Sequence, residues 1–319
     1  MPRRLTALAT GLLTLTLLLL SCATARAQAR EQLTLMTWNI HGGNSLMTLY
    51  PSTNINNNCV VIPANVNPVK RRIALYNSTH THKIDAIALQ EVHKGQAEEL
   101  ARGLGYPPPY FVTTKVCNSG NRQLDYGNAV LSPHRMTSLY PYQINNIADS
   151  ERKFGEYNRI AAASVWLPSG RPVRVYSSHL TANPTDSEAA HQALLNKQVS
   201  EALFIVIADE YAVFHGLTSV LMTDFNTTER TDAYDHMVNP ARGGLFDDAW
   251  RKVHPAGTGR TYPASTTHLR LDHIFYDRRS KLTVTGAEVL DICDTSGGPA
   301  SKMDDCISDH RPVVATMLF

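Results

Sequence analysis

The chain has 319 residues, of which 43% are hydrophobic, and a formal net charge of +2 at pH 7. These values fit a globular protein with a large core and one or two domains. A balance this close to neutral excludes the strong positive field of an avid nucleic-acid binder, although it is compatible with local basic patches.

Residues 1–27 have the composition of a secretory signal: two arginines, the apolar run 5–20, then small residues. The run is shorter than the roughly 20 apolar residues with which a helix usually spans a bilayer. Cleavage after Ala27, within an Ala-Arg-Ala site, would release a secreted protein with a single domain over 28–319. The alternative is a Leu-Leu-Ser-Cys lipoprotein box with a lipid anchor at Cys22 on the cell surface. We favour ordinary cleavage, which removes three arginines and lowers the net charge by three units.

Short apolar segments rich in β-branched and aromatic residues predict strands along the whole chain. They cover residues 33–40, 84–91, 128–132, 160–167, 173–179, 218–223, 271–277, 282–290 and 312–319. A long helix is expected after Thr185, which has capping-box spacing to Glu188, and a shorter one over 69–80. The Asn- and Pro-rich segment 44–67 is expected to be an irregular insertion. Many strands with few helices favour packed sheets with helices outside.

Polar residues gather where these strands end or begin. They are Asn39, Gln90, Glu91, Asn128, His179, Asp224, Asn226, Asp272, Asp309 and His310. Taken singly, each is explained as a turn former, an ion-pair partner or a structural histidine. Taken together they indicate a site, because strand ends and the adjoining loops are where rigid scaffolds carry function.

The residue types indicate phosphoryl chemistry. An oxygen-only set of Asn39, Glu91 and Asp309 suits Mg²⁺, with Mn²⁺ as the alternative cation. The histidines lack a His-x-x-x-His spacing and there is no Cys-x-x-Cys, which argues against zinc. Neighbouring extended residues point in opposite directions, so Asp309 is expected to face the metal and His310 the substrate. Asp272, on another strand, is the candidate acid that orients His310.

The motifs TWNIHGG, LQEVH, YGNAVLS, SSHLTANP, MTDFN, LRLDHIF and ISDHRP, in this order, resemble the endonuclease/exonuclease/phosphatase superfamily, which includes pancreatic-type deoxyribonuclease. The resemblance spans residues 33–319. It implies an α/β fold, a four-layered sandwich of two mixed β-sheets flanked by helices. The sequence departs from the family pattern at Thr223, where Gly is usual, and at Ile84, where Pro is usual. These departures leave the polar side chains unchanged, so they bear on substrate choice more than on activity.

The resemblance also implies a role for each polar residue. Carried over position by position, it gives metal ligands at Asn39, Glu91 and Asp309, catalytic groups at His179, Asp224, Asn226, Asp272 and His310, and phosphate-binding groups at Asn128 and Arg159.

Ordinary signal cleavage and lipoprotein cleavage both leave four cysteines with a free side chain, an even number that predicts disulfides in an exported protein. Cys293 and Cys306 would close a short Gly-, Ser- and Asp-rich loop directly before the Ser-Asp-His triplet. Cys59 and Cys117 are then paired by elimination. Buried free thiols are the alternative.

The expected function is that of a secreted, Mg²⁺-dependent phosphodiesterase acting on DNA or RNA. The alternative is a phosphoinositide phosphatase or a sphingomyelinase-type lipid phosphodiesterase, because the phosphate machinery is shared and specificity lies in loops. Tyrosines near the motifs would either stack on bases, rest on a membrane or pack in the core; these are Tyr50, Tyr106, Tyr110 and Tyr126. We expect a monomer with a nucleic-acid or phospholipid substrate, no protein partner and no transmembrane segment. The complete polar set argues against a binding protein that has lost catalysis.

Overall fold

A computed structural model describes residues 30–41, 66–115, 125–146, 158–182, 187–213, 218–293 and 306–319. Residues Gln32–Phe319 form one compact unit. Several expectations concern residues outside the described ranges: the signal at 1–27, the anchor at Cys22, the pair Cys59 and Cys117, most of the insertion, and the cap at Thr185.

Two six-stranded sheets form the centre of this unit. The first has the order β11-β12-β1-β2-β4-β3 and contains β1 (Gln32–Asn39), β2 (Ala86–His93), β3 (Tyr110–Lys115), β4 (Tyr126–Leu131), β11 (Thr283–Val289) and β12 (Val313–Leu318). The second has the order β5-β6-β7-β8-β10-β9 and contains β5 (Met136–Ile144), β6 (Asn158–Trp166), β7 (Pro172–His179), β8 (Thr218–Asp224), β9 (Phe246–Asp248) and β10 (Asp272–Asp277). The pairs β1–β2 and β7–β8 are parallel and the other pairings are antiparallel, so both sheets are mixed.

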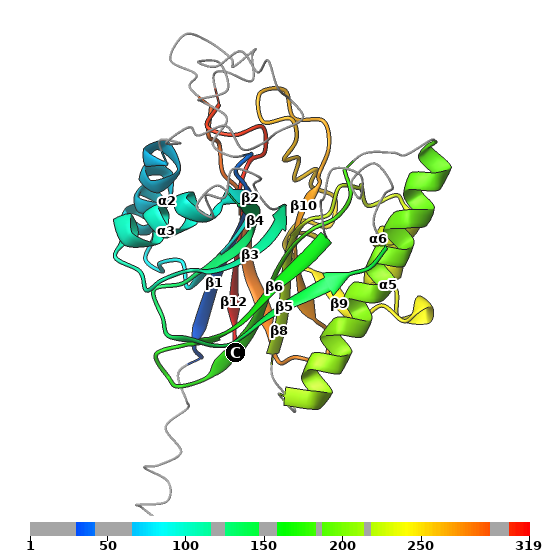
Figure 1. Cartoon of the computed structure of the whole chain (residues 1–319), viewed down its shortest axis with the longest axis horizontal. Coiled ribbons are helices and arrows are strands. Elements are labelled where there is room, and N and C mark those ends of the chain that lie inside the picture. Colours follow the sequence, from blue (N-terminus) through cyan, green and yellow to red (C-terminus); the bar gives the residue numbers. More distant parts are fainter. Residues whose placement is uncertain are drawn as a thin grey trace, which may run out of the picture. The chain divides into compact units, whose positions relative to one another are not determined.

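Helices cover the outer face of each sheet (Figure 1). On the first sheet lie α2 (Asn67–Thr79) and α3 (Lys94–Leu104), and on the second lie α5 (Glu188–Val213) and α6 (Asp232–Val238). Two shorter elements, η3 (Pro240–Arg242) and α7 (Ala249–Val253), flank β9. One buried apolar cluster fills the space between the sheets, and a further cluster lies under each pair of helices. The predicted four-layered sandwich is therefore confirmed.

Strand β1 shows how the sequence builds these layers. Leu33 and Leu35 point into the cluster between the sheets, whereas Met36 and Trp38 point into the cluster under α2 and α3. This alternation follows from the two-residue repeat of a strand, in which neighbouring side chains face opposite sides. Because both faces of β1 are covered, the strand is apolar on both sides rather than on one.

All strands and both helices expected from the sequence are present in the structure. The structure also contains elements that were not expected from the sequence: β3, β5, β9, α3, α6, η3 and α7.

The Sγ atoms of Cys293 and Cys306 lie 1.99 Å apart, at disulfide distance, which agrees with the predicted pairing. Within the described ranges, no helix has the length and apolar composition that a membrane crossing requires.

Candidate active site

The strand register brings polar side chains from the second sheet to one edge. In β8 the even-numbered residues Val220 and Met222 face the first sheet, so Asp224 at the strand's end points the same way. His179, at the end of parallel β7, pairs with Asp224, and Asp272, at the start of antiparallel β10, pairs with it from the other side. Three neighbouring strands thus deliver His179, Asp224 and Asp272 side by side.

The first sheet contributes Asn39 and Glu91 at the same place. Asn39 continues the inward-facing positions of β1. Glu91 reaches the inner side through a β-bulge: the pairing of β2 with β4 shifts between Leu89 and Val92, and Glu91 has a left-handed φ of 53°. Both Leu89 and Val92 face the helices, so the alternation changes by one residue between them. The carboxylate of Glu91 is turned toward the second sheet as a result.

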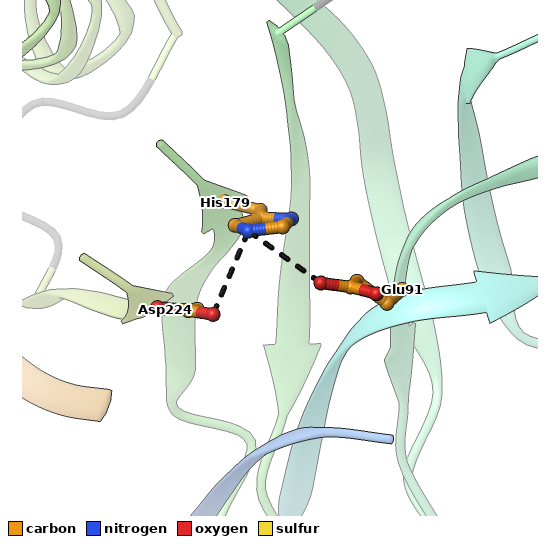
Figure 2. A group of neighbouring side chains, drawn as sticks. All are labelled: Glu91, His179 and Asp224. Carbon is orange, nitrogen blue, oxygen red and sulfur yellow. Dashed lines mark ion pairs between the residues drawn. The ribbon is translucent and has the colours of Figure 1, made fainter. Parts of the chain in front are cut away.

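His179 joins the two sheets electrostatically (Figure 2). Its Nε2 atom lies 3.8 Å from Glu91 Oε1 and 3.5 Å from Asp224 Oδ2. The side-chain nitrogen of Asn39 donates hydrogen bonds to the same two oxygens, at 2.9 and 2.8 Å. The donor atoms of Glu91, His179 and Asp224 all lie within 4.8 Å of one another, a spacing that can hold a metal ion.

A buried histidine–carboxylate pair lies on the other side of Asp224. His310 Nδ1 is 2.8 Å from Asp272 Oδ2, and His310 Nε2 is 3.6 Å from Asp224 Oδ2. The main chain of His310 is fixed by Trp38, whose indole nitrogen donates to its carbonyl oxygen at 3.0 Å. Ser308 donates to the carbonyl oxygen of Asn39 at 2.8 Å and so ties this loop to the end of β1.

Asp309 contacts a residue that the sequence analysis did not assign. Its Oδ2 atom lies 2.7 Å from Nδ1 of His41, and its Oδ1 atom accepts from Ser308 at 3.3 Å. His41 follows β1, has a left-handed φ of 44°, and donates its main-chain N–H to Asn39 Oδ1 at 2.9 Å. The oxygen of Asn39, expected as a metal ligand, is therefore engaged by His41, and its nitrogen faces the carboxylates.

The remaining predicted residues are held mainly by main-chain contacts. Asn226 donates its main-chain N–H to Asp224 Oδ1 at 3.1 Å and its side-chain amide to the carbonyl of Leu180 at 2.8 Å. Asn128 donates to the carbonyl of Arg159 at 2.8 Å, and Arg159 donates to the carbonyl of Thr113 at 3.0 Å. The phosphate-binding role expected of Asn128 and Arg159 stays a prediction.

Burial and neighbouring charges set the protonation states of the cluster. Burial would raise the pKa of Glu91, but the charges of His179 and His41 and the hydrogen bonds from Tyr126 and Asn39 lower it to about 2. Glu91 is therefore ionised at neutral pH.

The pKa values of His310 and Asp224 are raised, in contrast to that of Glu91. Burial would lower the pKa of His310, but the charges of Asp272 and Asp224 raise it to about 10, so the imidazole is positive at neutral pH. Burial raises the pKa of Asp224; the positive charges of His310 and His179 oppose this shift, and the negative charge of Asp272 adds to it. A buried carboxylate with a raised pKa is suited to accept a proton.

Two members of the cluster, His41 and Tyr126, were not predicted from the sequence. His41 lies within the quoted motif TWNIHGG, but its contact with Asp309 depends on a turn that the motif does not reveal. Tyr126 was noted only as a tyrosine near the site, whereas its hydroxyl donates to Glu91 Oε2. The position of Tyr126 at the start of β4, beside β2, was the available signal.

Comparisons with known proteins agree with this fold. The model of the Endonuclease/Exonuclease/phosphatase family matches residues 36–310. No curated protein matches the sequence.

Among solved structures, a family member from Bacteroides thetaiotaomicron is 16% identical with a TM-score of 0.66, covering 91% of this chain and 96% of that one. A mannosyl-6-phosphatase from the same organism is 17% identical with a TM-score of 0.63, covering 90% of this chain and 100% of that one. The catalytic domain of human nocturnin with bound sulfate is 16% identical with a TM-score of 0.60, covering 91% and 98%. These likenesses show the shared fold. The match to the family model spans most of the chain, so this protein belongs to the Endonuclease/Exonuclease/phosphatase family.

Proposed function

We propose that this protein is a metal-dependent phosphodiesterase that hydrolyses phosphoester bonds with an activated water, and that its substrate is DNA or RNA. The observation that supports this most directly is the assembly, from both sheets, of an ionised carboxylate, a buried carboxylate with a raised pKa and a charged histidine. These are Glu91, Asp224 and His310, linked through His179 and Asp272.

Glu91 and Asp309 are the proposed holders of the cation. Both offer hard oxygen ligands, and the low pKa of Glu91 keeps it ionised and ready to bind. A bound Mg²⁺ or Mn²⁺ would supply Lewis-acid charge that neutralises the phosphoryl oxygens. Asn39, with its nitrogen on Glu91 Oε1 and Asp224 Oδ2, has the role of holding both carboxylates in place.

The remaining groups act on the water and the phosphate. Asp224 accepts the proton of the attacking water, and the main chain of Asn226 holds the Asp224 carboxylate in orientation. The buried Nε2 atom of His179 makes no hydrogen bond within the described ranges and is available to a phosphoryl oxygen. His310, held positive by Asp272, stabilises the negative charge that develops on the phosphate.

We also infer that the enzyme acts outside the cytosol. The signal pattern of residues 1–27 and the pair Cys293 and Cys306 support this, because disulfides persist in oxidising compartments.

Chelation followed by metal addition tests the proposal. The protein is stripped with EDTA, supplied with Mg²⁺ or Mn²⁺, and incubated with DNA, RNA, phosphoinositides, sphingomyelin and a sugar phosphomonoester. We expect nucleic-acid hydrolysis that EDTA removes and either cation restores, and no restoration in Glu91→Gln at ordinary Mg²⁺.

The matched control is Glu98→Gln on α3, whose carboxylate pairs with Lys94 at 2.7 Å in a partly exposed ion pair. It removes one negative charge and should keep full activity. Full activity of the unchanged protein in EDTA would refute the metal requirement. Hydrolysis confined to lipids or to the sugar phosphate would reject nucleic acid as the substrate.

A further inference from the structure

The loop between α7 and β10 brings an aromatic and an aliphatic side chain together beside the catalytic histidine. Tyr262 and Leu269 form an antiparallel bridge: the N–H of Tyr262 donates to the carbonyl of Leu269 at 3.0 Å, and the reverse bond is 2.9 Å. Residues directly opposite each other in such a pair carry their side chains on the same face. Tyr262 is half-buried, and Leu269 is 40% exposed.

This pair adjoins the reaction centre. The ring of Tyr262 lies 4.8 Å from the imidazole of His310, centroid to centroid, at an angle of 45°. Since His310 is proposed to act on the phosphate, a group attached to that phosphate can reach the Tyr262 ring and the Leu269 side chain opposite it. The two side chains are therefore placed to sort substrates by the group next to the reacting bond.

Hydrogen bonds from main-chain N–H groups fix the loop to Asp272 on one side and to the segment Asp309–Arg311 on the other. The hydroxyl of buried Thr261 accepts from the N–H groups of Leu271 and Asp272, at 3.1 and 3.3 Å. The N–H of Arg311 donates to the carbonyl of Thr261 at 2.9 Å, and that of Ala264 donates to the carbonyl of Asp309 at 2.7 Å. A surface held in this way is preorganised, so binding to it costs little ordering of the protein.

We propose that Tyr262 and Leu269 form a stacking platform for the nucleobase attached to the reacting phosphate. This deepens the proposed function and rests on it. One ring and one short aliphatic side chain match the size of a single planar base, and base–aromatic stacking tolerates any sequence because every base has a π-face.

A lipid surface fits the platform less well, because membrane docking needs a larger apolar area. The other large exposed apolar side chains in the described part of the chain lie on α2, β5 and α5, so they do not enlarge the apolar surface of the loop that carries Tyr262 and Leu269. They are Leu75, Leu139, Tyr140, Phe204 and Tyr211.

Two chromogenic phosphodiesters test the platform directly. Thymidine 5′-(4-nitrophenyl phosphate) carries a base, and methyl 4-nitrophenyl phosphate does not. We define the base preference as kcat/KM for the thymidine ester divided by kcat/KM for the methyl ester. Any general damage to His310 cancels in this ratio, because such damage slows the hydrolysis of both esters alike. We expect Tyr262→Leu to lower the base preference by roughly 5- to 150-fold, the range that stacking of one base supplies.

Further variants distinguish the contribution of the Tyr262 ring from those of its hydroxyl group and of Leu269. Tyr262→Phe should keep the base preference, because the ring remains. Leu269→Ser should lower it less than Tyr262→Leu, and it carries the test if Tyr262→Leu melts early. Tyr211→Leu removes a tyrosine that is 70% exposed on α5 and should change nothing.

The outcomes distinguish the platform from the function on which it rests. An equal loss on both esters in Tyr262→Leu, or an unchanged base preference in Tyr262→Leu and Leu269→Ser, overturns the platform and leaves the phosphodiesterase in place. Failure of the unchanged enzyme to cleave either ester with Mg²⁺ or Mn²⁺, while it hydrolyses a lipid or phosphomonoester, overturns the proposed nuclease and the platform with it.

Discussion

His310 lies between two buried carboxylates, 2.8 Å from Asp272 and 3.6 Å from Asp224. If Asp272 only orients the imidazole and keeps it charged, the two residues act as a unit. His310→Ala should then lower kcat by about 10²–10³-fold, the usual cost of removing one group that stabilises developing charge. Asp272→Asn should also lower kcat, and the double variant should lose little beyond the worse single one, because effects within such a unit are not additive.

A second histidine–aspartate pair in the same protein provides the control. His134 Nε2 lies 2.8 Å from Asp85 Oδ1, at the ends of strands and apart from the cluster around Asp224. His134→Ala and Asp85→Asn should leave kcat unchanged even where they lower the melting temperature. Additive losses of rate at His310 and Asp272 would break the proposed unit, and normal rates with lower melting would make both residues structural.

His273, next to Asp272 but on the opposite face of β10, is expected to make the fold sensitive to acid. Burial lowers its pKa, and the charge of Arg270 lowers it further, against the opposing effects of Asp248 and Asp272. The unfolded chain takes up a proton on this histidine near pH 6.5, whereas the folded protein resists it until lower pH. Stability is therefore lost as pH falls below about 6.5.

Denaturant unfolding between pH 7.5 and pH 5 measures this effect. Replacing the histidine in His273→Leu should reduce the slope of unfolding free energy against pH by up to about 1.4 kcal/mol per pH unit, the equivalent of one proton. Parallel curves for the two proteins would show that His273 does not titrate differently in the folded and unfolded states.

Helix α5 is held to the second sheet by a buried ion pair as well as by apolar packing. Arg174 on β7 donates from Nε to Asp209 on α5 at 2.6 Å, and the hydroxyl of Tyr176 donates to the same carboxylate at 2.7 Å. Asp209→Ala removes the carboxylate that neutralises a buried guanidinium charge, so it should cost about 3–5 kcal/mol of unfolding free energy.

The exposed pair of Arg242 and Asp232, 3.3 Å apart, is the comparison. Asp232→Ala should leave the unfolding free energy nearly unchanged, because water screens the charges. Chemical denaturation of the two variants gives both values. A loss below 1 kcal/mol in Asp209→Ala would mean that apolar contacts alone fix the helix.

The elements that the sequence predicted are the ones with continuous apolar runs or a clear helical repeat. β5 was not predicted because its middle is exposed and contains Pro141. β9 was not predicted because it has only three residues. α3 begins directly after β2 without a turn, and its capping box uses His93 and Gln96, a pairing that standard capping residues do not suggest.

The site shows the same division between local and long-range information. The strand-end positions of His179, Asp224 and Asp272 follow from periodicity, so the sequence located them. The inward turn of Glu91 follows from a bulge, and the contact of His41 with Asp309 from a fold-dependent meeting of distant loops. Neither leaves a pattern in neighbouring residues.

At the scale of the whole molecule, the candidate site exists only when the two sheets are packed together. Asn39 and Glu91 come from the first sheet, and His179, Asp224 and Asp272 from the second. The hydrogen bonds from Asn39 to Glu91 and Asp224 cross this boundary. Packing of the central core and assembly of the site are thus the same event.

The cysteine pair acts on the whole chain in a different way, through the unfolded state. A bond between Cys293 and Cys306, 13 positions apart, restricts the unfolded chain, and the chain-entropy model assigns about 3 kcal/mol to a loop of this size. The loop that follows, which carries Asp309 and His310, is held by other contacts: Ser308 bonds to Asn39, and Ala264 bonds to Asp309. The double variant Cys293→Ser with Cys306→Ser should therefore lose about 3 kcal/mol of unfolding free energy and keep kcat within a few-fold at 25 °C.

Denaturant titrations with and without dithiothreitol, together with measurements of kcat, check both parts of this prediction. The reductant should lower the stability of the unchanged protein to that of the double variant. It should leave the stability of the double variant unchanged. Equal stability of oxidised and reduced protein would show that the bond does not constrain the chain, and a large loss of kcat in the variant would show that it also shapes the site.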